Sequence, residues 1–123
     1  MTCIFCEKDT EKVIFQNEYA KAFYDEFPVN QGHVLIVPKA HREHYFELSQ
    51  DEVLAILELL HECRAYIAER FQADGFNIGW NCGEEAGQSV FHAHCHLIPR
   101  YKGDVDKPKG GIRNFKEALV KYD

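Results

Sequence analysis

Residues 87–100 read GQSVFHAHCHLIPR and contain three histidines that alternate with other residues. In a β-strand, side chains at positions i, i+2 and i+4 emerge on one face, so the rings of His92, His94 and His96 are expected side by side at steps of about 7 Å. We therefore predict a strand over residues 90–99 that carries three titratable rings on one face. Three such rings in register indicate a functional site rather than a chance surface feature.

Imidazole rings offer this site two kinds of chemistry. A neutral ring is a good metal ligand, and near neutral pH it is also a nucleophile and a proton carrier, because its ordinary pKa is about 6.5. Three rings that bind one catalytic metal would activate water for hydrolysis. A ring that keeps a bare nitrogen would attack the substrate directly. The spacing alone leaves both readings open.

Length and composition favour one soluble domain. The 123 residues suffice for one hydrophobic core, and we expect a single domain over residues 1–123. The chain shows no apolar run of about 18 residues and no signal-like N-terminus, so we expect no membrane partner and a cytoplasmic location. Five cysteines in such a chain are expected to be reduced thiols or metal ligands rather than disulfides.

The charge argues against broad binding to nucleic acid, because the formal net charge is -6. Residues 100–116 are an exception, with six basic and two acidic residues. This segment can meet an anionic ligand or can be a solvated tail, and the composition does not choose between the two.

One long helix is the clearest element outside the histidine stretch. Ser49 and Glu52 are expected to form a capping box, in which each side chain accepts a hydrogen bond from the backbone N–H of the other. The helix should begin there and run to about Gln72, before Asp74 and Gly75. Its apolar stripe, which needs a sheet to cover, consists of Val53, Ile56, Leu57, Leu60, Cys63, Ile67 and Phe71.

Four further segments have the composition of strands. Together with the histidine stretch they predict an α+β domain with a mainly antiparallel, five-stranded sheet. A short helix over residues 114–122 is expected to follow a loop at residues 103–111. The four additional strands are expected at residues 13–15, 19–24, 33–37 and 76–81.

The histidine stretch and its surroundings resemble the histidine triad (HIT) superfamily of nucleotidyl hydrolases and transferases. The family signature alternates three histidines with apolar residues, and residues 92–98 match it at every position. The resemblance runs along nearly the whole chain and implies a HIT-like fold. Other segments that carry it are residues 22–25, 32–41, 81–83 and 86–90.

The resemblance implies a covalent mechanism at phosphorus. His94 corresponds to the nucleophile, whose ring is held in one tautomer by the backbone carbonyl of His92. His96 corresponds to the residue that contacts a phosphoryl or bridging oxygen and helps the leaving group depart. An imidazole that attacks phosphorus divides one difficult displacement into two easier ones. We expect no catalytic metal in such a site.

The same resemblance implies contacts to a nucleotide. Asp25 matches a residue that accepts hydrogen bonds from ribose hydroxyls, and Asn81 matches one near the α-phosphate. Gln88 and Ser89, in the turn before the histidines, are expected to bind the phosphoryl oxygens. The simpler readings are a turn residue for Asp25 and a strand-end cap for Asn81.

A second cluster is expected near the N-terminus. Cys3 and Cys6 have the CxxC spacing at which two thiolates reach one Zn²⁺, although such a pair alone is a weak signal. Several branches of the superfamily complete this site with the residues that correspond to His41 and His92, which implies a structural zinc. His44 is an alternative fourth ligand, and two ordinary thiols are the alternative to a metal site.

The branch that this chain resembles acts on dinucleoside polyphosphates, as residues 85–88, 98–100 and 103–104 indicate. The expected function is hydrolysis of nucleoside 5′-polyphosphates through a nucleotidyl-histidine intermediate, with release of a nucleoside monophosphate. The alternatives are a nucleoside phosphoramidase and a nucleotide-binding regulator with little turnover. We expect a purine nucleotide substrate and a homodimer that pairs through the long helix and an edge strand.

Overall fold

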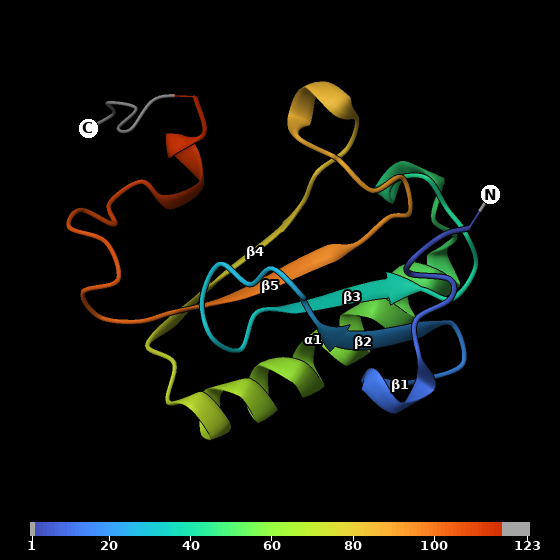
Figure 1. The fold of residues 1–123 in the computed structure, drawn as a ribbon, viewed down its shortest axis with the longest axis horizontal. Helices are drawn as coiled ribbons and strands as arrows, with labels where there is room; N and C mark the ends of the chain where they lie inside the picture. Colours follow the sequence, from blue (N-terminus) through green and yellow to red (C-terminus); the bar gives the residue numbers. More distant parts are fainter. Residues whose placement is uncertain (1, 117–123) are drawn as a thin grey trace.

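The structure, a computed structural model that describes residues 2–116, contains a five-stranded antiparallel sheet (Figure 1). The strands lie in the order β1-β2-β3-β5-β4, and each neighbouring pair is antiparallel. Together with the long helix α1, this sheet confirms the predicted α+β class. The strands are β1 (Val13–Gln16), β2 (Ala20–Tyr24), β3 (Val34–Pro38), β4 (Gly75–Trp80) and β5 (Cys95–Arg100).

Helix α1 (Gln50–Phe71) begins at the predicted capping box. The Oγ of Ser49 accepts a hydrogen bond from the N–H of Glu52 at 3.2 Å, and a carboxylate oxygen of Glu52 accepts one from the N–H of Ser49 at 2.8 Å. The same carboxylate pairs with the guanidinium of Arg42 at 3.1 Å. The helix ends where Gln72 adopts a left-handed conformation with φ 58°. Both predicted helix boundaries are therefore confirmed.

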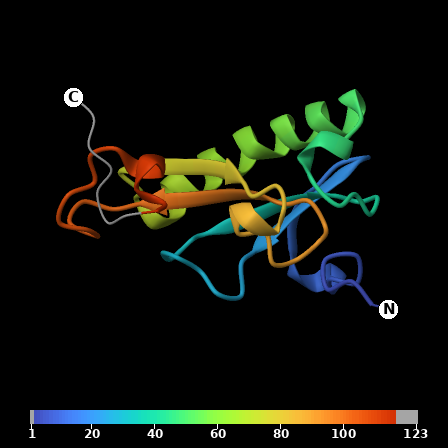
Figure 2. The same cartoon turned by 90° about the horizontal axis from the view of Figure 1, so that it is seen from above.

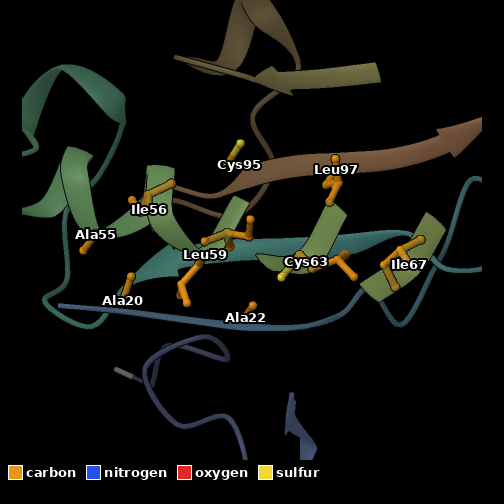
Figure 3. Packing of buried hydrophobic residues seen from close by; sticks show 11 residues of the cluster. Ala20, Ala22, Ala55, Ile56, Leu59, Cys63, Ile67, Cys95 and Leu97 are labelled. Atoms are coloured by element: carbon orange, nitrogen blue, oxygen red, sulfur yellow. The ribbon is translucent and has the colours of Figure 1, made fainter. Parts of the chain in front are cut away.

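Helix α1 packs along one face of the sheet (Figure 2). The predicted stripe is confirmed at Ile56, Cys63 and Ile67, but Leu57 is 46% exposed and Leu59 is buried in its stead. The buried positions 55, 59, 63 and 67 advance in steps of four, which places residue 57 on the opposite side of the helix. The core (Figure 3) consists of Ala20, Ala22, Val34, Ile36, Ala55, Ile56, Leu59, Cys63, Ile67, Cys95 and Leu97.

We expect Leu59→Ala to lower the free energy of unfolding by about 3–5 kcal/mol, because it leaves a cavity between α1 and the sheet. The matched variant Leu57→Ala removes the same atoms from an exposed position and should cost less than about 1 kcal/mol. Urea denaturation of both variants measures the difference. Equal losses at the two positions would contradict this description of the core.

The opposite face of the sheet carries a smaller cluster of Phe5, Phe23, Leu35 and Val37. The N-terminal segment lies on this side (Figure 2), and the ring of Phe5 packs on Phe23 with centroids 5.5 Å apart. Side chains alternate along a strand, so Cys95 and Leu97 in β5 face α1 while His96 faces the other side. The third histidine of the triad therefore lies on the face that the helix leaves free.

The histidine strand is shorter than predicted at its N-terminal end. It was expected to begin at residue 90, but β5 begins at Cys95, so His92 and His94 precede the sheet. The pairing of β5 with β3 ends at Ile36 and Cys95 and its pairing with β4 ends at Trp80 and Cys95, so both ladders stop at Cys95. The carbonyl of Pro38 lies 2.9 Å from Nε2 of His92.

The remaining elements agree with the predictions to within a few residues. Strand β4 begins and ends one residue earlier than expected. A short 3-10 helix occupies Glu84–Ala86 between β4 and β5, and another spans Gly111–Asn114. The helix predicted over residues 114–122 falls mostly outside the described residues. Within residues 2–116, no helix combines the length and apolar character of a membrane span.

Candidate active site

The three histidines of the triad divide into two groups. The ring of His92 is fully buried and faces the N-terminal cysteines. The rings of His94 and His96 are neighbours, with centroids 4.9 Å apart and an angle of 63° between their planes. The predicted sharing of one side by the three rings is compatible with the ring contacts, since Phe5 packs against both His92 and His94 with centroids 5.9 and 5.0 Å apart. The predicted strand was too long, because His92 and His94 precede β5.

The ring of His94 is held in one tautomer by the backbone of its own segment. Its Nδ1 lies 2.8 Å from the carbonyl oxygen of His92. A carbonyl oxygen only accepts hydrogen bonds, so Nδ1 carries the proton and Nε2 of the neutral ring keeps a bare lone pair. The side chain is 8% exposed and its ring packs edge-on against Phe5, with centroids 5.0 Å apart. In a neutral ring, the position predicted as the nucleophile thus presents Nε2 rather than Nδ1 as its lone pair.

The ring of His96 has a different environment. Its Nδ1 lies 3.0 Å from Nε2 of His33, whereas its buried Nε2 has no hydrogen-bond partner among the described residues. Burial lowers the pKa of His96 to about 4, with further contributions from His94 and His33. The ring is therefore neutral near neutral pH, and one of its polar atoms is left for a ligand.

The lowered pKa of His96 predicts a loss of stability in acid. The unfolded ring binds a proton as the pH falls through 6.5, whereas the folded ring does so only near pH 4. The unfolded chain thus binds more protons in this window, so stability is fully present above pH 6.5 and is lost toward pH 4. We expect this group to reduce the free energy of unfolding by about 2 kcal/mol between pH 7 and pH 5.

Denaturation of the wild type and of His96→Asn at the two pH values measures this contribution. Both proteins share the other buried histidines, so the difference between their pH dependences isolates residue 96. An equally steep loss of stability in the variant would assign the effect to other groups.

A cavity of about 550 Å³ opens beside His96. Its polar wall includes the side chains of Asp25, His33 and Asn81, which were predicted as site residues except for His33. Two of its aromatic side chains are unusually exposed, Phe27 by 89% and Phe115 by 79%. The apolar wall includes Phe27, Val29, Ile78, Trp80, Ile98, Ile112 and Phe115. A flat apolar ring and a polar, anionic group can therefore occupy the same cavity.

Asp25 and His33 lie at the two ends of the β2–β3 connection. The N–H of Asp25 donates to the carbonyl of His33 at 3.0 Å, and Oδ1 of Asp25 accepts from the N–H of Phe27 at 2.8 Å. Gly32 has φ 93°, and a Cβ there would lie 2.9 Å from the ring of Phe71, so α1 packs directly on this turn. His33 was predicted only as the first residue of the strand over residues 33–37, within the family-like segment 32–41, and was not singled out as a site residue.

Gln88 and Ser89 are placed differently from the predicted phosphate ligands. The buried amide of Gln88 accepts from the N–H of Gly83 at 2.8 Å and donates to the carbonyls of Glu43 and Val90 at 2.6 and 3.1 Å. Its backbone N–H donates to the carbonyl of Gly83. A direct phosphate contact by Gln88 would require these bonds to open, so the geometry favours a role in bracing the loop. Ser89 is exposed and lines a neighbouring cavity of about 670 Å³.

The predicted metal ligands converge on one point. Their donor atoms lie within 4.8 Å of one another in a group formed by Cys3, Cys6, His41 and His92. The Nδ1 of His92 is 3.3 Å from Sγ of Cys3 and 3.4 Å from Sγ of Cys6. The Nδ1 of His41 is 3.3 Å from Sγ of Cys6 and 3.2 Å from Nδ1 of His92. These separations fit a tetrahedral ion with bonds of about 2.0–2.3 Å.

The tautomer of His92 also fits a metal site. Its Nε2 lies 2.9 Å from the carbonyl oxygen of Pro38 and must donate to it, which leaves Nδ1 as a lone pair toward the cysteines. Burial lowers the pKa of His92, so the ring stays neutral as a ligand must. His44 is not a member of this group, and its buried Nδ1 has no partner among the described residues. The structure therefore favours His41 as the fourth ligand.

Comparison with known proteins agrees with this geometry. An uncharacterized HIT-like protein of Methanocaldococcus jannaschii is 39% identical over 117 residues, covering 91% of this chain and 90% of the relative. The solved structure of a Zn-bound histidine triad family protein from Mycobacterium smegmatis matches with a TM-score of 0.75 and 31% identity, covering 85% of this chain and 78% of that chain.

A relative whose name states an activity is a longer protein than this chain. Bis(5′-adenosyl)-triphosphatase of Saccharomyces cerevisiae is 38% identical over 99 residues, which cover 76% of this chain but only 46% of the yeast protein. The family model of the HIT domain matches residues 7–103, a range that includes the triad, the cavity wall of β4 and β5, and the loop that carries Asn81. The chain therefore belongs to the HIT domain family.

Proposed function

We propose that this protein is a nucleotidyl hydrolase that cleaves nucleoside 5′-polyphosphates, including dinucleoside polyphosphates, through a covalent intermediate on His94. The observation that carries this proposal is the tautomer of His94, whose Nδ1–H donates to the carbonyl of His92 while Nε2 stays bare. An imidazole ring held in this tautomer, next to the His96 ring that lines a cavity with polar and apolar walls, is suited to attack on phosphorus.

The reaction proceeds in two displacements. In the first, the lone pair on Nε2 of His94 forms a bond to the α-phosphorus, and the bond from phosphorus to the bridging oxygen breaks with its electron pair on that oxygen. His96, in contact with His94, stabilises the charge on the departing or phosphoryl oxygen. In the second, water attacks phosphorus and the phosphorus–nitrogen bond breaks, which restores the lone pair of His94 and releases the nucleoside monophosphate.

The cavity accommodates the rest of a purine nucleotide. We assign the base to the exposed apolar wall around Phe27 and Ile78, and the ribose hydroxyls to the carboxylate of Asp25. Asn81, on the polar wall beside His96, is assigned to the α-phosphate. Ser89 as a phosphate ligand stays a prediction. These assignments put the scissile bond at the end of the cavity lined by His96, whose ring is next to that of His94.

A metallohydrolase that uses the triad as its ligand set is less well supported. Such a site needs the donor atoms of all three rings to converge on one ion. The ring of His92 is turned toward Cys3 and Cys6, and Nδ1 of His94 is engaged with a backbone carbonyl. We instead assign a structural Zn²⁺ to the cysteine and histidine cluster, where it would hold the N-terminal segment against the segment before β5. The Zn-bound mycobacterial relative supports this assignment.

A trapping experiment tests the covalent step. The protein is mixed with adenosine triphosphate labelled at the α-phosphate and quenched in base within one turnover, because phosphorus–nitrogen bonds to histidine are labile in acid. We expect label on the wild type and none on His94→Asn. The matched control His61→Asn changes an exposed histidine of α1 and should retain the label. Turnover without any adduct on the wild type would overturn the proposal.

A substrate panel separates the polyphosphate hydrolase from a phosphoramidase. Both enzymes would use the same histidines, so only relative rates distinguish them. We expect diadenosine polyphosphates to be cleaved at higher kcat/KM than an adenosine phosphoramidate, as the similarity to the yeast triphosphatase suggests. The reverse order would assign the phosphoramidase, and tight nucleotide binding without cleavage would assign a regulator.

A homodimer is proposed through α1 and the edge of the sheet. Leu54 and Leu57 are large apolar side chains on the exposed side of α1, and β4 is an edge strand of the sheet. Edge strands and apolar helix faces are surfaces that a second copy can cover. Sedimentation of the wild type at micromolar concentration, with Leu57→Glu as the disrupting variant, measures the oligomeric state.

A further inference from the structure

Gly79 is a glycine in the middle of strand β4 whose position does not require one. Its φ lies outside the left-handed range that favours glycine. A Cβ at this position would meet no atom of the described residues within 4 Å, so no neighbouring group excludes a larger residue. Glycine also weakens a strand, because it loses more conformational freedom on folding than other residues and has no side chain to pack. Neither the backbone nor the packing of the described residues therefore explains this glycine.

The side chain that Gly79 lacks would point into the cavity beside His96. The register of β4 and β5 pairs Gly79 with His96, and residues directly opposite one another in antiparallel strands project from the same face of the sheet. Both residues line the cavity of about 550 Å³. A glycine inside a strand often marks a place where a ligand approaches the backbone closely. The bare backbone at residue 79 thus leaves space next to the ring of His96.

The order of the strands indicates which part of a substrate would use this space. His96 is paired with Leu35 of β3 on one side and with Gly79 of β4 on the other. Asp25, which we assign to the ribose, follows β2 and therefore lies on the β3 side of His96. The nucleoside and the leaving group occupy different bonds of the reacting phosphorus, so a nucleoside directed toward Asp25 leaves the β4 side to the leaving group. Strand β4 is at the edge of the sheet (Figure 1), and no further strand of the described residues lies beyond it.

We propose that Gly79 is a specificity-determining residue that admits a large leaving group, such as a nucleoside diphosphate, beside His96. This inference rests on the proposed function, because it concerns the leaving group of that reaction. A side chain at position 79 would fill the space next to His96 and exclude large leaving groups, whereas small ones would still fit. Glycine at this position thus favours dinucleoside polyphosphates over substrates in which the group that leaves phosphorus is small.

Steady-state kinetics of Gly79→Val and Gly79→Ala with three substrates test this proposal. Diadenosine triphosphate releases adenosine diphosphate, adenosine triphosphate releases pyrophosphate, and adenosine 5′-phosphoramidate releases ammonia, so the nucleoside is constant while the leaving group becomes smaller. We expect Gly79→Val to lower kcat/KM about tenfold or more for diadenosine triphosphate and less than about twofold for the phosphoramidate. Gly79→Ala should show smaller losses in the same order.

Gly75→Val is the matched control. Gly75 lies in the same strand and on the same face, and a Cβ there would likewise meet no described atom within 4 Å. It lines a different cavity from Gly79, so the variant should keep the rates for all three substrates. Valine suits a strand better than glycine, so both valine variants should unfold at the same temperature as the wild type or at a higher one. A loss of activity without a loss of stability separates a steric effect at the site from damage to the fold.

Equal losses for the three substrates in Gly79→Val, or no loss for any of them, would overturn the proposal. Equal losses together with altered sedimentation would assign the space to a second copy of the chain instead. If the wild type cleaves none of the substrates, the hydrolase function fails, but calorimetric titration still decides this inference. Gly79→Val should then bind a non-hydrolysable analogue of diadenosine triphosphate about tenfold more weakly and bind adenosine monophosphate unchanged. Equal changes in the two affinities would contradict the role of Gly79.

Discussion

The variant His94→Asn is expected to lose about 10⁴-fold or more in kcat for nucleotide cleavage. The asparagine amide nitrogen has no lone pair that can attack phosphorus, so the covalent route is closed, and losses of this size are typical when a nucleophile is removed. Binding should change little, because the groups that line the cavity are untouched. Single-turnover rates give the chemical step, and calorimetric titration with a non-hydrolysable analogue gives the affinity.

His61→Asn is the matched control for this loss, because it makes the same chemical change on the exposed side of α1. It should keep activity and thermal stability within experimental error. A tenfold or smaller loss in His94→Asn would indicate that another group attacks phosphorus. A large loss accompanied by a fall in the unfolding temperature would instead indicate a structural defect, so both quantities are measured on each variant.

Removal of the metal is expected to lower the stability of the fold substantially. The wild type should contain one Zn²⁺ per chain by elemental analysis, and Cys6→Ser should contain much less. Because the ligands come from the N-terminal segment, residue 41 and residue 92, a bound metal joins three separate parts of the chain. We expect Cys6→Ser, or prolonged chelation of the wild type, to lower the unfolding temperature by about 10 °C.

Cys82→Ser is the control for the thiol, since Cys82 is a free cysteine outside the metal-ligand group. It should retain both the metal and the unfolding temperature. A wild type purified from zinc-containing medium without bound metal would remove the zinc assignment. Loss of the metal from Cys6→Ser with no change in unfolding temperature would show that the metal binds but does not stabilise the fold.

The features that the sequence predicted well depend on short-range rules. The capping box at Ser49 and Glu52 needs only residues three apart, and the strand of β3 follows from a run of apolar residues that ends at Pro38. The metal cluster was also found, because Cys3 and Cys6 are a local pair and the histidines were supplied by the family resemblance. Local spacing and a specific motif were sufficient for these features.

The features that were missed depend on contacts between distant segments. Residues 90–94 alternate like a strand, but the ladders to β3 and β4 both stop at Cys95, and this limit is set by pairing rather than by the residues themselves. Leu57 and Leu59 are equally apolar, and only the packing of α1 on the sheet decides which one is buried. The side chain of Gln88 forms hydrogen bonds with the backbone of Gly83, Glu43 and Val90, and no local sequence pattern predicts these partners.

The side chain of His92 belongs to the metal-ligand cluster, whereas its backbone carbonyl belongs to the triad. Its imidazole faces the cysteines, whereas the oxygen that orients His94 belongs to the main chain and survives exchange of the side chain. Mutagenesis at position 92 therefore does not probe proton transfer. A variant at position 92 with reduced activity would indicate that the N-terminal segment is held less firmly by the metal site. Its activity should return when zinc is added at high concentration and should not return when the pH is changed.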